Sequence, residues 1–303
     1  MSGPVVLLAG GTGGAKLARG LLDVVGAELT VIANTGDDIE IHGGHVSPDP
    51  DLVTFWLADR IDERGWGLRD DTFTVMEAMR ALGENVWFNL GDRDLGLCLA
   101  RARRLAAGES LTEIADDVRM ALGVPATVLP MSDDPVRTWI KVRGRWGPFQ
   151  EFMIRDRAAG PIADVEFRGA AGAAPTQEAL AAIAGAEAVI VGPSNPVISI
   201  GPILALPGMH EALRGCPGPV VAVSPLVGGR SLKGPTEAFL AWAGKPLTSD
   251  GIAECYDGLL DGLVADQRAS GMPTLETDVA MPDADGRRRL ADATLRFALA
   301  LAG

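Results

Sequence analysis

The fold is decided near the start of the chain, by Val5-Val6-Leu7-Leu8-Ala9-Gly10-Gly11-Thr12-Gly13-Gly14-Ala15-Lys16. The apolar run Val5 to Ala9 predicts a strand buried on both faces, as in a parallel sheet. A glycine-rich loop follows, and Lys16 to Val25 then carries apolar residues at helical spacing. The next apolar run, Leu29 to Ala33, completes a β-loop-α-β unit. Such a unit begins the doubly wound parallel sheet of a Rossmann-like α/β fold.

Three later apolar runs end, like the first, in polar loops that contain glycine. They are Val86–Leu90, Glu187–Val191 and Val220–Val223, and each predicts a further strand of the same sheet. The carboxyl ends of parallel strands meet at one edge, where open α/β sheets bind their ligands. We therefore expect the loops after all five strands to converge on one site.

Helical patterns separate these strands. The predicted helices run from Asp71 to about Leu82, from Ser110 to about Leu122, from Thr176 to Ile183 and from Arg289 to Leu301. The second opens with a capping-box pattern, Ser110-Leu111-Thr112-Glu113. Between Thr138 and Gly169 the pattern changes, because Trp139–Val142 and Phe149–Ile154 read as strands joined by turns. We expect one Rossmann-like domain over residues 1–303, with a smaller β-rich insertion subdomain at about 136–170.

Composition excludes several classes of protein. The chain has 303 residues, of which 47% are hydrophobic and 22% charged, so a disordered or fibrous protein is excluded. Its formal charge of −13 argues against binding to nucleic acid or to an anionic membrane. The three cysteines are far apart, and neither a signal peptide nor a membrane span is expected. We expect a cytoplasmic protein that acts on small molecules, and a homodimer by general frequency.

The loop Gly10-Gly11-Thr12-Gly13-Gly14 can present bare backbone amides to a phosphate at a helix N-terminus. It is not a Walker A loop, because Lys16 is followed by Leu17 and the glycine spacing differs. It is also a poor dinucleotide fingerprint, since Lys16 stands where the third glycine is required. The loop therefore predicts phosphate binding, with a tight turn that binds no ligand as the alternative.

Two acidic segments come directly after the second strand, Asn34-Thr35-Gly36-Asp37-Asp38 and Pro48-Asp49-Pro50-Asp51. Magnesium beside a diphosphate commonly takes one or two carboxylates. These segments therefore predict a magnesium site, although solvated loops with helix N-caps would carry the same residues.

Three further loops offer polar groups to a ligand. The segment Gly91-Asp92-Arg93-Asp94 fits polar ligand binding or a salt-bridged turn. Ser194 and Asn195, between Pro193 and Pro196, fit a guanine edge or a ribose, or else form a rigid turn. Ser224 to Lys233, with Arg230 and Lys233, offers cations to a phosphate. The histidines His42, His45 and His210 form no catalytic pattern.

Taken together, these motifs resemble the CofD-like 2-phospho-L-lactate transferases, which build the deazaflavin coenzyme F-420. The matching segments, in family order, are 10–16, 34–38, 48–51, 90–95, 129–136, 149–152, 192–204 and 223–225. The resemblance implies a modified Rossmann fold and a magnesium-dependent phosphotransferase. A guanosine diphosphate-linked donor would give 2-phospholactate or phosphoenolpyruvate to the deazaflavin Fo. The ribityl hydroxyl of Fo would attack the distal phosphorus, and GMP would leave.

The resemblance also implies roles for individual residues. Asp51 matches a position that contacts Fo, and Asp37 is the best further metal ligand, so both are expected to be catalytic and to bind Mg²⁺. Asn89 matches a second Fo-binding position, where relatives often have a basic residue. The nucleotide would be bound by Gly10, Gly11, Thr12, Gly13, Gly14, Lys16, Ser194, Asn195, Pro196, Ser224 and Lys233. Fo would be bound by Asp51, Asn89, Asp92, Arg93 and Asp94, its ring lying against the segment 51–94.

Two other functions stay open at this point. A regulatory protein of the same fold could bind a nucleotide sugar, but it would not need the segments 48–51 and 91–94. A glycosyltransferase could use the glycine loop, although two full Rossmann domains would be expected in more than 303 residues. The sequence also leaves open whether the acid transferred is phospholactate, phosphoenolpyruvate or phosphoglycerate.

Overall fold

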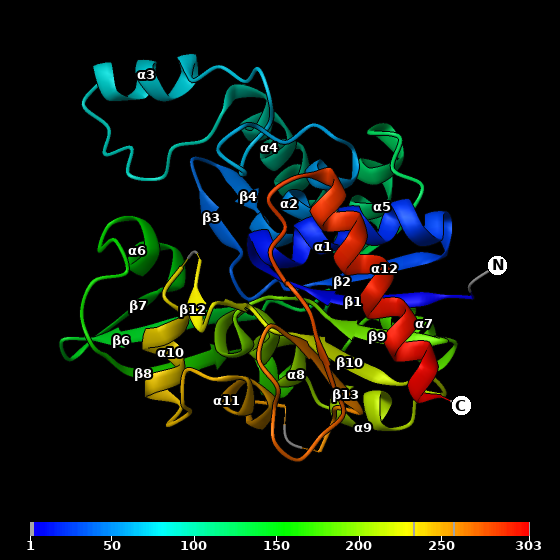
Figure 1. Cartoon of the computed structure of the whole chain (residues 1–303). Coiled ribbons are helices and arrows are strands. Elements are labelled where there is room, and N and C mark those ends of the chain that lie inside the picture. The colour runs from blue at the N-terminus through cyan, green and yellow to red at the C-terminus, as the bar shows by residue number, and fades with distance from the viewer. Residues whose placement is uncertain (1–2, 233, 257, 303) are drawn as a thin grey trace.

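A computed structural model of the chain describes residues 3–232, 234–256 and 258–302 (Figure 1). Its centre is a seven-stranded sheet in the order β14-β13-β10-β9-β1-β2-β5. In that order the strands are Thr274–Glu276, Gly262–Ala265, Val220–Val223, Ala188–Val191, Val5–Ala9, Leu29–Ala33 and Thr127–Pro130. All neighbouring strands in it run parallel, which confirms the predicted doubly wound α/β fold.

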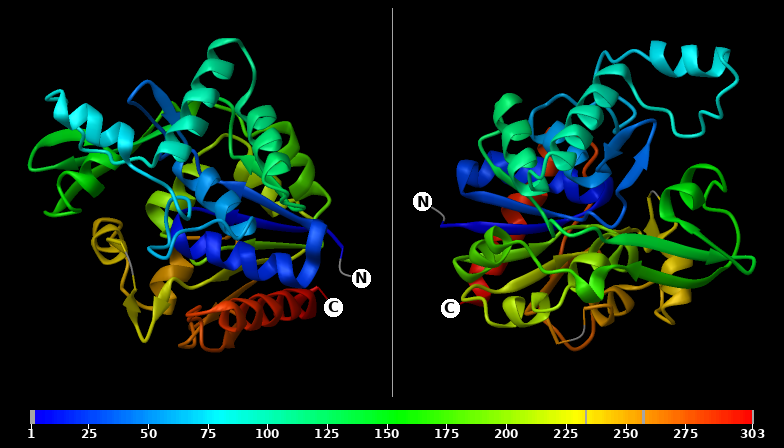
Figure 2. Two further views of the ribbon diagram at one scale, coloured as in Figure 1. Left: turned by 90° about the horizontal axis from the view of Figure 1, so that it is seen from above. Right: turned by 180° about the vertical axis from the view of Figure 1, so that it is seen from behind.

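The first strand shows why this sheet is buried on both faces. Val5, Leu7 and Ala9 belong to one hydrophobic cluster, whereas Val6 and Leu8 belong to another. Successive side chains of a strand point to opposite faces, so a run of apolar residues requires helices on both sides. Helices α1 (Gly11–Val25), α2 (Pro48–Leu57) and α12 (Ala284–Leu301) contribute to the first cluster. Helices α7 (Gln177–Ala184), α9 (Met209–Arg214) and α11 (Ser249–Glu254) contribute to the second (Figures 1 and 2).

The strand order changes direction beside β1. The chain places β2 and β5 on one side of β1, and then returns to place β9, β10, β13 and β14 on the other side. The topological switch point therefore lies between β1 and β9. In folds of this kind the ligand crevice lies outside the carboxyl ends of the strands at that point.

The predicted strand Val86–Leu90 is wrong. This segment is irregular and connects α3 (Thr74–Ala81) to α4 (Asp92–Ala106). Phe88 and Leu90 pack with Met76 in a small cluster apart from the central sheet. A short apolar run indicates that a segment is buried. It does not show that the segment pairs with a strand of the sheet.

The predicted helix that begins at Asp71 starts later, at Thr74, and Asp71 does not cap it. Asp92 accepts the backbone N–H groups of Thr74 and Val75, each at 3.0 Å. Asp71 instead accepts those of Arg93 at 2.9 Å and Asp94 at 3.2 Å, at the start of α4. Asp92, the first residue of α4, thus caps α3, and Asp71, which precedes α3, caps α4. Helix α3 projects from the body of the molecule (Figures 1 and 2).

A three-stranded antiparallel sheet occupies most of the predicted insertion. It contains β7 (Arg145–Pro148), β6 (Arg137–Val142) and β8 (Ile162–Arg168), so the strand predicted at Trp139–Val142 is confirmed. The strand predicted at Phe149–Ile154 is wrong, because this segment is helix α6. Phe149 and Phe152 are three residues apart and pack into one cluster with Phe239, which only a helix allows.

The remaining predicted helices are confirmed. Helix α5 (Leu111–Ala121) has the capping box at Ser110, and Thr176 caps α7 through the backbone N–H of Ala179. The C-terminal helix α12 begins five residues earlier than predicted, with Asp283 as its cap. The other elements are β3 (Ile39–Ile41), β4 (Gly44–Val46), α8 (Gly201–Leu204), β11 (Leu226–Val227), β12 (Arg230–Ser231), α10 (Thr236–Trp242) and the short turns η1 (Gly26–Glu28), η2 (Ala170–Gly172) and η3 (Pro196–Ile200). Among the described residues, no helix is both long and apolar enough to cross a membrane.

Candidate active site

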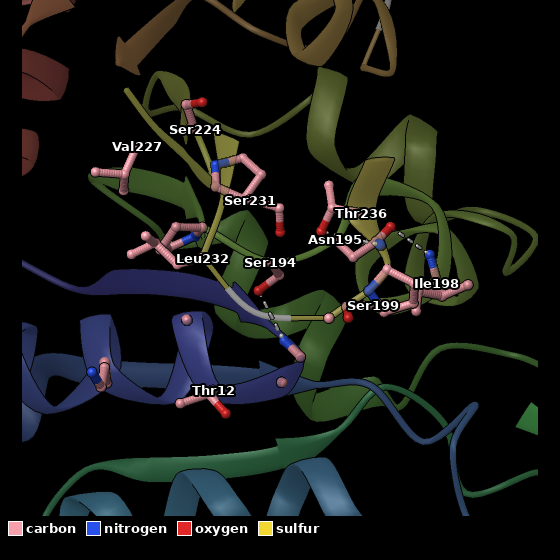
Figure 3. A pocket seen from close by; sticks show the side chains of 18 of the residues that line it. Thr12, Ser194, Asn195, Ile198, Ser199, Ser224, Val227, Ser231, Leu232 and Thr236 are labelled. Atoms are coloured by element: carbon pink, nitrogen blue, oxygen red, sulfur yellow. Dashed lines mark hydrogen bonds between the residues drawn. The ribbon is translucent and has the colours of Figure 1, made fainter. Parts of the chain in front are cut away.

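A cavity of about 470 Å³ lies at the switch point (Figure 3). It is walled by the loops after β1, β9 and β10, by Asp37 after β2, and by the segment that precedes α12. The residues expected to bind the nucleotide that line it are Gly10, Gly11, Thr12, Gly13, Lys16, Ser194, Asn195 and Ser224. The volume is that of a small-molecule site. We refer to it as the main cavity.

The glycine segment is the first turn of α1 and not the loop that was predicted. The helix begins at Gly11, whose φ of 63° favours glycine, immediately after the last residue of β1 and Gly10. A Cβ on Gly13 would lie 2.0 Å from the carbonyl oxygen of Pro193. Glycine therefore lets the loops after β1 and β9 touch, and the helix N-terminus faces the main cavity.

The loop after β9 is held by its own side chains. The Ser194 hydroxyl accepts the N–H of Gly10 at 3.3 Å. The Asn195 side-chain oxygen accepts the N–H groups of Val197 at 2.9 Å and Ile198 at 3.3 Å, while its amide donates to Thr236 at 3.5 Å. Both residues line the main cavity while they stiffen the turn (Figure 3).

The other residues expected to bind the nucleotide have different surroundings. Pro196 begins the turn η3, and Gly14 packs against Ser194 and Ala9. The Lys16 ammonium donates to the Met281 carbonyl at 3.1 Å, which ties α1 to the segment before α12. Lys233 lies outside the described residues.

Asp37 lies in the wall of the main cavity and is 7% exposed. Its Oδ1 has no hydrogen-bond partner within the part of the chain that the structure describes. Burial, together with the charge of Asp49, raises the pKa of Asp37 well above its usual range. A buried carboxylate oxygen without a donor is costly unless a cation or a proton accompanies it.

Asp49 also belongs to the candidate site. It lies in the motif Pro48-Asp49-Pro50-Asp51, from which the sequence predicted a role only for Asp51. Its carboxylate accepts the N–H of Gly11 at 2.7 Å and the side-chain amide of Asn34 at 2.9 Å. Burial raises its pKa to about 6, although these two hydrogen bonds lower it. Asp49 therefore joins the first turn of α2 to the first turn of α1, close to Asp37.

Asp51 lies in a second polar cluster, where it is bound by Arg101. The Arg101 guanidinium donates to both carboxylate oxygens of Asp51, and also to the backbone oxygen of His45 at 3.0 Å. Arg101 is 2% exposed and Asp51 is 6% exposed. Sequence reasoning missed Arg101, because an arginine in an amphipathic helix usually faces solvent.

Asp94 and Cys98 complete this cluster. One oxygen of Asp51, one of Asp94 and the Cys98 sulfur all lie within 4.8 Å of one another. Burial and the charge of Asp51 raise the pKa of Asp94 to about 7. Of the residues expected to bind Fo, the structure thus brings Asp51 and Asp94 together.

The other residues expected to bind Fo are placed differently. The Asp92 carboxylate caps α3, and Arg93 is exposed. The side-chain oxygen of Asn89 accepts a hydrogen bond from the Arg80 guanidinium at 2.7 Å. A cation from α3 therefore lies beside Asn89.

Residues 5–291 match the family described as 2-phospho-L-lactate transferase CofD. The chain belongs to this CofD family. It is 39% identical to a phosphoenolpyruvate transferase from Kitasatospora aureofaciens, over 98% of this chain and 97% of that protein. It is also 39% identical to a 2-phospho-L-lactate transferase from Methanosarcina mazei, over 87% of each chain. These matches make the protein a transferase of the CofD family.

Solved structures show where else this fold occurs. A protein member of the UPF0052 family from Bacillus halodurans matches 97% of this CofD-family chain, and the chain matches all of it, with a TM-score of 0.63. The sequence identity is 17%, so this similarity shows the fold alone.

The two clusters differ in how well they fit the magnesium that the resemblance implies. The unpartnered Asp37 oxygen, close to the second carboxylate of Asp49, offers the hard oxygen ligands that Mg²⁺ prefers. In the other cluster Asp51 is already neutralised by Arg101. Burial raises the pKa of the Cys98 thiol, and a protonated thiol is a poor ligand for Mg²⁺. The residues around Asp37 therefore fit the ion best.

Proposed function

We propose that this protein transfers a phospho-acyl group, 2-phospholactate or phosphoenolpyruvate, from a guanosine diphosphate-linked donor to Fo, with release of GMP, in coenzyme F-420 biosynthesis. The observation that carries the proposal is the meeting of two groups at the switch point. The N-terminus of α1 faces the main cavity, and the unpartnered Asp37 oxygen lies in its wall. Amide donors at a helix N-terminus can bind the phosphate oxygens of a diphosphate, and a carboxylate can hold the cation that neutralises its charge.

The donor diphosphate lies against the first turn of α1 in this proposal. Backbone amides at a helix N-terminus favour negative charge, and the glycines keep side chains away from the phosphates. Ser194, Asn195 and Ser224 line the same cavity and present neutral polar groups to the nucleoside. Their neutrality supports recognition of a base or a ribose better than recognition of a phosphate.

Asp37 would hold Mg²⁺ beside the diphosphate, and Asp51, expected as a second ligand, would have to share its oxygens with Arg101. A bound magnesium ion would neutralise charge that builds up on the phosphate oxygens. Both carboxylates therefore stay proposed catalytic residues, with Asp37 on the donor side.

The acceptor lies on the side of Asp51 and Asp94. Arg101 fixes the orientation of Asp51, whereas a pKa of about 7 leaves Asp94 able to exchange a proton near neutral pH. The cation of Arg80, held by Asn89, and the neighbouring Arg93 offer polar contacts to the ribityl tail. These residues belong to one continuous part of the chain, Asp51 to Arg101, which supports a common role toward Fo.

Mass spectrometry of the reaction products tests this function. Purified protein is incubated with Fo, magnesium and each candidate donor, carrying phospholactate, phosphoenolpyruvate or phosphoglycerate. We expect a phosphodiester of Fo and one equivalent of GMP with at least one of the first two donors. The proposal would be contradicted if GMP were released but no phosphodiester of Fo were formed, or if no donor reacted.

A further inference from the structure

A second, smaller cavity lies on the other side of Asp37. It holds about 130 Å³ and shares Asp37 and Phe149 with the main cavity. Its walls are the segment Gly36–Glu40, the start of β6 with Arg137, and the start of α6 with Gln150. We call it the side cavity.

We propose that the side cavity binds the three-carbon acid of the donor, and that Arg137 binds the carboxylate of that acid. This inference rests on the proposed function, because it assumes a diphosphate at the α1 N-terminus. From there the chain of the donor continues past the distal phosphate. Asp37 borders both cavities, so a donor whose distal phosphate lies at Asp37 has the side cavity next to it.

The size of the side cavity fits the acid and excludes Fo. Pockets for drug-sized ligands hold about 300–1,000 Å³. A cavity of about 130 Å³ cannot take a tricyclic ring with a ribityl tail. It can take an acid of three carbons, which displaces only a few water molecules.

Arg137 is the cation that a carboxylate would meet there. Its Nη2 donates to Glu40 at 2.6 Å and its Nη1 to the Val136 carbonyl at 2.9 Å. An arginine has five N–H donors, so it can bind a second carboxylate while it keeps these contacts.

Other carboxylates border the side cavity, and the structure shows how their charge is balanced. Asp38 accepts a hydrogen bond from Ser47 and lies 3.0 Å from His45. Glu40 lies 3.2 Å from the other ring nitrogen of His45 and is also paired with Arg137. The remaining carboxylate, Asp37, is the proposed ligand of the metal on the phosphate side.

Apart from Thr138 and Gln150, the rest of the wall is apolar and suits the carbon skeleton. Trp139, Pro148 and Phe149 line the side cavity, and the Arg168 guanidinium lies 3.8 Å from the centroid of the Trp139 ring. The Gln150 amide is held by the Asp37 carbonyl at 3.2 Å.

Three single variants test the inference. Arg137→Gln removes the proposed carboxylate ligand, and the KM for the donor should rise about ten- to hundredfold, since one charge-assisted hydrogen bond is lost. The Kd for GDP, measured by calorimetry, should stay within twofold of the wild type, because GDP lacks the acid. Glu40→Gln removes the partner of Arg137 but keeps the guanidinium, so the KM for the donor should be unchanged or lower. Arg145→Gln, an exposed arginine of the same antiparallel sheet, is the matched control.

The outcomes separate this inference from simpler explanations. An unchanged KM in Arg137→Gln overturns it, and so does an equal rise of KM in Glu40→Gln, which would mean that the ion pair only supports the fold. If Arg137→Gln does not fold, Arg137→Lys keeps the charge but not the paired donors, and an intermediate rise of KM is expected. An unchanged KM in Arg137→Lys with the Gln variant unfolded would also overturn it. A wild-type protein that is inactive with every donor contradicts the proposed function instead.

Discussion

At the residue scale, the two carboxylates that matter most have opposite surroundings. Asp51 is buried with Arg101, which donates to both of its oxygens. Asp37 is buried with an oxygen that has no donor among the described residues. Removing the partner of a buried charge destabilises the protein, because the remaining charge is uncompensated. Removing a buried charge that has no partner avoids the cost of burying it. Variants at the two sites should therefore affect stability in opposite directions.

Replacing the partner of Asp51 should destabilise the protein. Arg101→Met leaves the Asp51 carboxylate buried and unpaired, so the free energy of unfolding should fall by about 3–5 kcal/mol. Urea denaturation measures this change, and Arg103→Met, an exposed arginine of the same helix, should change it by less than about 0.5 kcal/mol. The double variant Arg101→Met with Asp51→Leu should recover much of the loss. A loss below about 1 kcal/mol in the single variant would show that the pair is not desolvated.

Replacing Asp37 should separate stability from activity. Asp37→Asn removes a buried charge whose pKa is raised by burial, so stability at pH 7 should stay equal or increase. The kcat of phospho-acyl transfer should fall by about 10²–10³, as for other groups that stabilise transition-state charge. Thermal unfolding and steady-state kinetics of the same preparation check both effects. A variant that retains full activity would rule out Asp37 as a catalytic residue.

At the element scale, short-range contacts between neighbouring segments hold the polar loops in place. The hairpin of β3 and β4 is closed by His45, which lies between Asp38 and Glu40. Helices α3 and α4 cap each other through Asp71 and Asp92. None of these contacts belongs to the central sheet. They can therefore be lost by local opening while the sheet remains folded.

The hairpin should lose stability as the pH rises. Burial lowers the pKa of His45, but its contacts with Asp38 and Glu40 outweigh this effect and raise it to about 9. Because the pKa is higher in the folded state, its contribution is complete below pH about 6.5 and is lost as the pH rises through about 9. The wild type should lose about 1–2 kcal/mol more than His45→Gln over this window, after allowance for solvent screening.

Denaturation of both proteins at several pH values measures this difference. Subtracting the two curves cancels Asp49 and Asp94, whose raised pKa values also make stability fall with rising pH. Parallel curves for the two proteins would exclude a charged His45.

At the scale of the whole molecule, the two proposed binding regions come from different parts of the fold. The donor region is built on the strand ends of the central sheet, around the main cavity. The acceptor region is built on α2, which packs on the sheet, and on α4 and the extension that carries α3 (Figure 1). Substitutions in one region should therefore change the binding of one substrate more than that of the other.

Fo affinity should respond to the acceptor region alone. Asp94→Asn and Arg93→Gln should each raise the Kd of Fo, by about tenfold for the half-buried Asp94 and less for the exposed Arg93. The Kd of GDP should stay within twofold in both variants. Fluorescence titration of Fo and calorimetry with GDP measure the two constants. If GDP affinity fell while Fo affinity stayed unchanged, the acceptor would have to lie elsewhere.

The central architecture could be predicted from the sequence alone. The strands Val5–Ala9, Leu29–Ala33 and Val220–Val223 could be read directly, because a strand covered on both faces is apolar at nearly every position, and Thr30 is the one polar residue in these three. The capping residue Ser110 was readable for a similar reason, since its capping box depends on a residue only three positions away. The residues proposed to bind the nucleotide followed from the strand ends that these runs define.

Which polar residues meet depends on how distant segments of the chain pack, and the sequence pattern does not show it. The pairing of Asp51 with Arg101 joins residues 50 positions apart, and although helical spacing puts Arg101 on the face of Leu95 and Cys98, no local pattern names its partner. The apolar segments at Phe88 and Phe149 were assigned to strands because a short apolar run shows burial but not its geometry. Local pattern depends on which faces are buried, whereas the partner of a buried charge depends on how distant segments pack. For that reason the sequence could place the carboxylates near one edge of the sheet, but only the fold shows that Asp51 lies with Arg101 whereas Asp37 lines the main cavity.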